Sequence, residues 1–113
     1  ARVLERWYRE QAERVFQEVV DRNMPSFTRL GYSRPDIKVR QMKRRWGSMH
    51  RHHLMLLNQD LVKAPLACIE YIVVHELSHM VHPHHQAPFH ALVEELMPDW
   101  RQHKQTLDRF MFQ

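Results

Sequence analysis

The pentad His75-Glu76-Leu77-Ser78-His79 places two histidines four positions apart, with a glutamate next to the first. In an α-helix, residues four apart stack on one face, so both imidazoles can bind one metal ion. Glu76 would then lie beside the metal, where a carboxylate can take a proton from a metal-bound water. Because the chain holds 10 His, so short a pattern can arise by chance, and the surrounding elements must support it.

A catalytic zinc site usually has three protein ligands and one open position, so the pentad needs a third ligand from elsewhere. Pro83 prevents the helix from continuing, and a histidine beyond it can fold back toward the metal. His85 follows His79 by six residues, the separation found in the HExxHxxGxxH pattern, and we predict it as the third ligand. The other candidates are two histidines before it and two glutamates after it: His82, His84, Glu94 and Glu95.

A long amphipathic helix is predicted at the start of the chain. Apolar residues recur there at three- and four-residue steps from Leu4 onward, and Pro25 should end or kink the helix near Asn23. We expect its aromatic residues, which include Trp7, in the core.

Strands are predicted at 37–42, 46–49 and 54–57, in a small antiparallel sheet. The pentad falls in a helix from about Pro65 to Val81, and two C-terminal helices follow, one from Pro88 and one carrying Trp100. The pattern therefore predicts a compact α+β fold: a long N-terminal helix, a three-stranded antiparallel sheet, the pentad helix and two C-terminal helices.

The length of 113 residues fits a single domain covering residues 1–113. The chain opens at Ala1 without an initiating Met, which suggests a fragment or trimmed piece of a longer chain. No stretch approaches the ~20 apolar residues that span a bilayer. Cys68 is the only cysteine, so no intrachain disulfide can form; a buried structural thiol and a cytoplasmic location are expected.

The chain is basic, with a formal net charge of +4. Between positions 34 and 51 seven cations face the single acid Asp36: Arg34, Lys38, Arg40, Lys43, Arg44, Arg45 and Arg51. A solvated strand face that protects a sheet edge explains such a stripe best. The alternative is an anion-binding surface for phosphates, nucleic acid or acidic peptides. The histidines of the expected hairpin turn, His50, His52 and His53, and His103 of the last helix are expected at the surface.

The sequence resembles the YgjP-like metallopeptidase domain over nearly its whole length. The resemblance is carried by Arg45-Trp46-Gly47-Ser48, Leu56-Leu57-Asn58, Leu61, Pro65, Tyr71-Ile72-Val73-Val74 with the pentad, His82-Pro83-His84-His85, Phe89 and Met97-Pro98-Asp99-Trp100. It implies a zincin-like domain with zinc on His75, His79 and His85, and with Glu76 as the general base. The family is also similar to SprT-like proteases, in which the third His precedes a Phe by four residues, as His85 precedes Phe89.

Two positions depart from the family pattern. The segment that usually reads Asn-His-Ser is His84-His85-Gln86 here, and Met49 replaces the usual Cys after Trp-Gly-Ser. Neither change removes a proposed ligand, although both alter its neighbours.

These residues predict a zinc metallopeptidase, in which Glu76 accepts a proton from water and delivers it to the leaving amine. The third strand, beside the pentad helix, could bind an extended peptide by backbone pairing. Arg45 and His53 are weak candidates for stabilising the oxyanion. The alternatives are a metal-dependent nucleotide or phosphoester hydrolase, a DNA-associated protease, and a non-enzymatic nucleic-acid-binding module. The His-rich site favours zinc over the carboxylate-rich chemistry of Mg²⁺.

Overall fold

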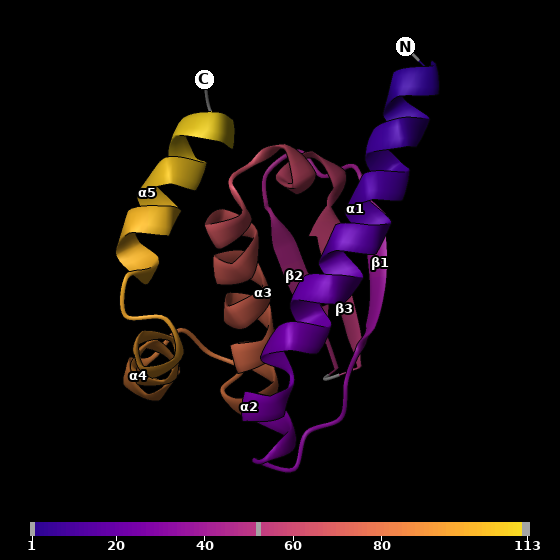
Figure 1. The fold of residues 1–113 in the computed structure, drawn as a ribbon. Helices are drawn as coiled ribbons and strands as arrows, with labels where there is room; N and C mark the ends of the chain where they lie inside the picture. Colours follow the sequence, from indigo (N-terminus) through magenta and orange to yellow (C-terminus); the bar gives the residue numbers. More distant parts are fainter. Residues whose placement is uncertain (1, 52, 112–113) are drawn as a thin grey trace.

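The computed structural model describes residues 2–51 and 53–111. Its elements run in the order α1 (Arg2–Asn23), α2 (Pro25–Thr28), β1 (Asp36–Arg40), β2 (Gly47–His50), β3 (Leu54–Asn58), the short 3₁₀ helix η1 (Gln59–Lys63), α3 (Leu66–Val81), α4 (Ala87–Leu96) and α5 (Trp100–Met111). The α+β class, the long N-terminal helix, the pentad helix and the two C-terminal helices are confirmed (Figure 1).

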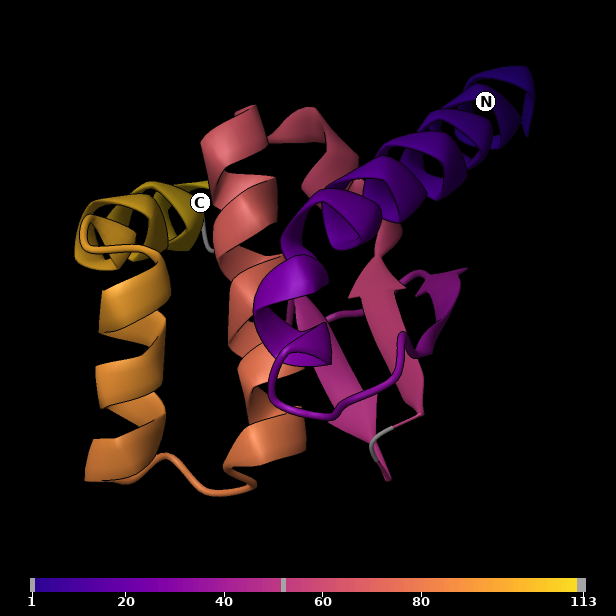
Figure 2. The same ribbon diagram turned by 60° about the horizontal axis from the view of Figure 1, so that its bottom comes forward.

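Two helices cover one face of the sheet. Helix α1 packs against β1 and α3 packs against β2, while α1 and α3 also contact each other. Figure 2 shows these helices on the same side of the strands, with α4 and α5 beyond α3. Helix α3 therefore lies between the sheet and the C-terminal helices, and ten of its residues are buried.

The expectation of an antiparallel sheet is wrong in one respect, because the sheet is mixed. The strand order is β1-β3-β2, with β3 antiparallel to β2 but parallel to β1. Strand β3 is thus the central strand, whereas β1 and β2 form the two edges. Side chains alternate across the sheet, so Met49 and Met55 face the helices while Ser48 and Leu56 face the opposite side.

Asn58 holds the segment that connects β1 to β2 by hydrogen bonds. It is the last residue of β3 and fully buried, and its side-chain amide donates hydrogen bonds to the carbonyl oxygens of Met42 (2.9 Å) and Arg45 (3.0 Å). Its backbone N–H donates to the carbonyl of Trp46 at 2.9 Å. The segment 41–46 therefore passes the end of β3 and carries the chain from one edge of the sheet to the other.

The N-terminal turns of α1 extend beyond the core. Phe16, Val19 and Val20 are buried as expected, but Leu4 is 57% exposed and Trp7 is 51% exposed, so their expected burial is wrong. The helix has 22 residues and rises about 33 Å, whereas the five-residue strands extend only about 17 Å. The first turns therefore find no sheet to pack on (Figure 1).

Prolines set the bounds of α3 close to the predicted positions. Pro65 is the N-cap rather than the first helical residue, and the helix ends at Val81, two residues before Pro83. Cys68 is buried as predicted, 1% exposed, and burial raises the pKa of its thiol. Within residues 2–51 and 53–111, no helix has the length and apolar content needed to cross a membrane.

Candidate metal centre

The end of α3 and the turn that follows it bring three imidazoles together. Nitrogen atoms of His75, His79 and His85, one from each ring, lie within 4.8 Å of one another. The Nε2 atoms of His79 and His85 are 2.8 Å apart, the separation of a nitrogen–nitrogen hydrogen bond. Zinc–nitrogen distances of 2.0–2.1 Å in a tetrahedron separate ligand atoms by about 3.3 Å. The imidazoles therefore need only small movements to share one ion, and His85 is exposed.

A backbone carbonyl orients His79. Its Nδ1 lies 3.2 Å from the carbonyl oxygen of His82, the C-cap of α3. Donation of the Nδ1 proton to this oxygen leaves the Nε2 lone pair directed at the neighbouring imidazoles. His82 thus serves the site through its backbone, which the extended conformation before Pro83 makes available.

Phe89 forms the floor beneath the three imidazoles. It is 1% exposed on α4, and its ring stacks on His79 with centroids 4.5 Å apart. It meets His75 edge-on at 5.0 Å and His85 at 5.0 Å. The loop after α3 and the first turn of α4 fold back together, which brings Phe89 into contact with His85, four residues before it.

The environment keeps the imidazole of His75 uncharged. Burial, followed by the neighbouring His79 and His85, lowers the pKa of His75 to about 3. Burial also lowers the pKa of His79, although its contact with the His82 carbonyl opposes the shift. Both rings are therefore neutral near pH 7, the form that binds a metal.

Glu76 is buried beside this cluster, 6% exposed. Burial raises the pKa of its carboxyl to about 7, and the nearby positive charge of Arg45 opposes the increase. A carboxyl that titrates near neutral pH can both accept and return a proton during a reaction. The site therefore places a carboxyl that titrates near neutral pH beside the neutral imidazoles of His75 and His79.

Glycine at position 47 lets β2 approach Glu76. A Cβ atom at Gly47 would lie 3.1 Å from Cδ2 of Leu57, 3.2 Å from Cγ of Glu76 and 3.2 Å from the carbonyl oxygen of Leu56. Such distances are tighter than ordinary contacts, so a side chain here would push against the glutamate or the sheet. The sequence contains the Trp-Gly-Ser segment, but only the packing shows that its glycine allows β2 to lie close to Glu76.

The histidines open into a cleft of about 500 Å³ along β2. The residues that line it are Arg45, Gly47, Ser48, Met49, Arg51, His75, Glu76, His79, Pro83 and His85. The third strand was expected to hold a peptide here, and that expectation is wrong because β3 is paired on both sides. The strand beside α3 is β2, whose outer edge has no strand partner among the described residues.

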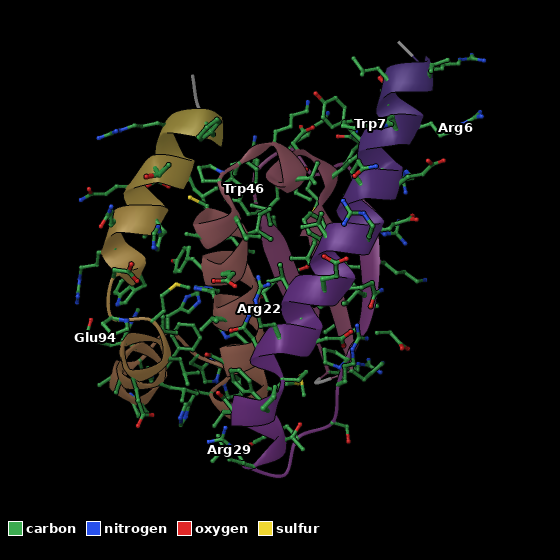
Figure 3. The ribbon with its side chains drawn as sticks, viewed as in Figure 1. Arg6, Trp7, Arg22, Arg29, Trp46 and Glu94 are labelled. Carbon is green, nitrogen blue, oxygen red and sulfur yellow. The ribbon has the colours of Figure 1, made fainter. Side chains whose placement is uncertain are left out.

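The competing ligands lie elsewhere. Glu94 accepts hydrogen bonds from Nε1 of Trp100 (3.0 Å) and from Arg101 (2.7 Å), which joins α4 to α5. Figure 3 shows Glu94 on α4. Glu95 and His84 are exposed and outside the histidine cluster.

The hairpin histidines and His103 differ in exposure. His50 and His53 are exposed as expected, and His52 lies outside the described residues. His53 does not line the cleft, so Arg45 is the better placed of the two oxyanion candidates. His103 is only partly exposed, with its side chain 13% exposed and its Nε2 3.0 Å from a carboxylate oxygen of Asp99.

The basic stripe does not form one surface. Arg34 pairs with Asp21 of α1 at 2.6 Å. Lys38 and Arg40 border a groove between β1 and α1 together with Arg9, whereas Arg45 and Arg51 line the metal cleft at the opposite edge of the sheet. The fold therefore divides these cations between two places.

Comparison with known families gives one match. The model described as "YgjP-like, metallopeptidase domain" covers residues 1–110. Comparison with curated proteins finds no match.

Proposed function

The chain belongs to the YgjP-like metallopeptidase family, and on this basis we propose that it is a zinc-dependent peptidase. Family membership implies a divalent metal and a peptide or protein substrate. The observation that supports zinc is the donor set, since imidazole nitrogens suit zinc whereas Mg²⁺ and Ca²⁺ prefer oxygen ligands. Within the described residues, His75, His79 and His85 would hold the ion and leave a coordination position free.

Bound zinc supplies Lewis acidity, which activates a water molecule and polarises the scissile carbonyl. Glu76 lies beside the histidines and accepts the proton of the attacking water, because its pKa of about 7 matches the working pH. It then returns this proton to the amine that leaves. Arg45 brings positive charge to the same cleft.

The free edge of β2 gives the substrate a place to bind. An extended peptide can pair its backbone with this strand and so lie across the cleft that Glu76 and the histidines line. Backbone pairing fixes the position of the scissile bond with little demand on the side chains. We place this activity in the cytoplasm, in line with the single cysteine.

The test compares the wild-type protein with Glu76→Gln. Both proteins are loaded with zinc, their metal content is measured, and hydrolysis of casein and of nucleoside triphosphates is followed in parallel. We expect one zinc per chain in both proteins, and casein cleavage that falls by about 10²- to 10⁴-fold in the variant. Casein cleavage that persists with zinc retained excludes Glu76 as the base. Hydrolysis of the triphosphates alone excludes the peptidase.

A further inference from the structure

The charge in the metal cleft is unbalanced. Among the described residues that line it, Glu76 is the only acid, while Arg45 and Arg51 carry full positive charges. They lie at opposite ends of β2, whose four residues extend about 13 Å. Arg45 lies two residues before Gly47 and Arg51 one residue after His50, and both line the same cleft, so both guanidinium groups lie within reach of one extended peptide.

These two arginines lack the ion pairs that several other arginines of the fold make. Arg22 pairs with Glu70, Arg34 with Asp21 and Arg101 with Glu94, each through a carboxylate oxygen. The guanidinium groups of Arg45 and Arg51 make no hydrogen bond or ion pair with any other residue that the structure describes, and only their backbone carbonyls accept bonds. Their charges are therefore available to a ligand in the cleft.

The backbone holds both arginines in place. The carbonyl of Arg45 accepts a hydrogen bond from the fully buried Asn58, so the segment next to the cleft is fixed from the core. Arg51 has a φ of 52°, in the left-handed region that arginine rarely adopts. Gly or Asn would adopt this backbone conformation with less strain. The presence of a large cationic residue here therefore points to a role for its side chain.

We propose that the cleft selects extended peptides with carboxylate side chains on either side of the scissile bond, recognised by Arg45 at the Gly47 end of β2 and by Arg51 at the other end. This specificity rests on the proposed peptidase function. Gly47 lies against Glu76. Arg45, at the Gly47 end of β2, therefore recognises the carboxylate side chain that is nearer to the scissile bond. Aspartate and glutamate both fit, since guanidinium groups bind carboxylates through paired hydrogen bonds.

The test measures binding, so it does not depend on turnover. Labelled peptides that differ only in Glu, Gln or Lys on either side of a central bond are titrated against zinc-loaded Glu76→Gln, and binding is followed by fluorescence anisotropy. We expect the Glu peptides to bind about three- to tenfold more tightly than the Gln peptides, and the Lys peptides to bind more weakly still. Added salt should reduce the difference.

Three further variants, made in the same background, assign the effect to individual residues. Arg45→Gln and Arg51→Asn should each reduce the preference for Glu, and asparagine suits the left-handed backbone at position 51. The matched control is Arg44→Gln, which removes one charge from an exposed neighbour outside the cleft and should leave the preference unchanged. Equal binding of Glu and Gln peptides, or an equal loss in the control, overturns the proposal.

The same peptides separate this proposal from the peptidase function. If zinc-loaded wild-type protein cleaves Glu and Gln peptides at the same rate, the peptidase stands and the specificity is wrong. If the Glu peptides bind selectively but none is cleaved, the specificity stands and the peptidase is wrong. A nucleoside triphosphate that binds through both arginines, with no preference among the peptides, would assign these cations to phosphate and overturn the proposal.

Discussion

The position that a Cβ atom would occupy at Gly47 lies 3.2 Å from Cγ of Glu76. Strand β2 thus lies directly against Glu76, the residue that we propose as the base, and limits how far its carboxyl can move. Because Gly47 has no side chain, strand β2 and Glu76 can lie close together.

Gly47→Ala should therefore reduce both turnover and stability. We expect kcat to fall by about tenfold or more as Glu76 is displaced, with overpacking costing about 1–3 kcal/mol of unfolding free energy. Peptide hydrolysis and urea unfolding measure the two effects, and zinc content should stay at the wild-type level. Ser33→Ala is the control, since this exposed residue lies outside the cleft. Equal loss of kcat in both variants would contradict this role.

His85→Ala tests the third ligand. We expect the affinity for zinc, measured by competition with a chromophoric chelator, to fall by more than about 100-fold. Loss of a direct ligand should weaken zinc binding more than loss of a residue that only contacts a ligand. His84→Ala removes the exposed neighbouring histidine and should bind zinc like the wild-type protein. If the two variants lose the same affinity, His85 is not a ligand.

Asn58→Ala should loosen the segment 41–46. The variant leaves the carbonyls of Met42 and Arg45 without their donor in the core, and we expect a loss of about 2–4 kcal/mol in unfolding free energy. Hydrogen exchange of the amides in this segment should accelerate. Asn23→Ala, which removes one partly exposed bond to the carbonyl of Val19, should cost about 1 kcal/mol or less. Comparable losses in the two variants would show that Asn58 does not fix the segment.

The stability of the metal-free protein should depend on pH through two opposing groups. The pKa of His75 is about 3 when folded and 6.5 ordinarily, so stability is lost as the pH falls below 6.5. The pKa of Glu76 is about 7 when folded and 4.5 ordinarily, so stability is lost as the pH rises from 4.5 to 7. Between pH 4.5 and 6.5 the effects largely cancel, and below pH 4.5 stability decreases.

Glu76→Gln removes one of these effects. In the chelator-treated variant, the decline should begin at pH 6.5 instead of 4.5, with a slope of about 1 kcal/mol per pH unit. Urea unfolding between pH 4 and 8 measures both curves. Parallel curves for the variant and the wild-type protein would show that Glu76 does not hold its proton in the folded state.

Much of the fold could be predicted from the sequence because its signals are local. Proline positions and apolar spacing located α1, α3 and α4 within one or two residues. The alternation of residues 37–42 indicated a strand, but strand pairing depends on contacts between distant residues. The parallel pairing of β1 with β3 requires the chain to cross the end of β3, where Asn58 binds the crossing segment, and no periodicity reveals this crossing.

The candidate site, too, could be predicted from the sequence only where the signals are local. The spacing of the pentad and the turn at Pro83 brought His75, His79 and His85 into one hypothesis, and the structure places them together. Their identity as zinc ligands stays a prediction. The contact of Gly47 with Glu76 and the separation of the basic stripe could not be predicted, because both arise from packing between elements.

All three histidines lie between residues 75 and 85, in one helix end and one turn. Movement of the turn around Pro83 alone can withdraw His85, while the core formed by α1, α3 and the sheet stays folded. We therefore expect a bound ion to exchange with solution on the timescale of this local opening, far faster than global unfolding. A bound ion should in turn slow the opening, and so join the C-terminal helices more firmly to the rest of the molecule.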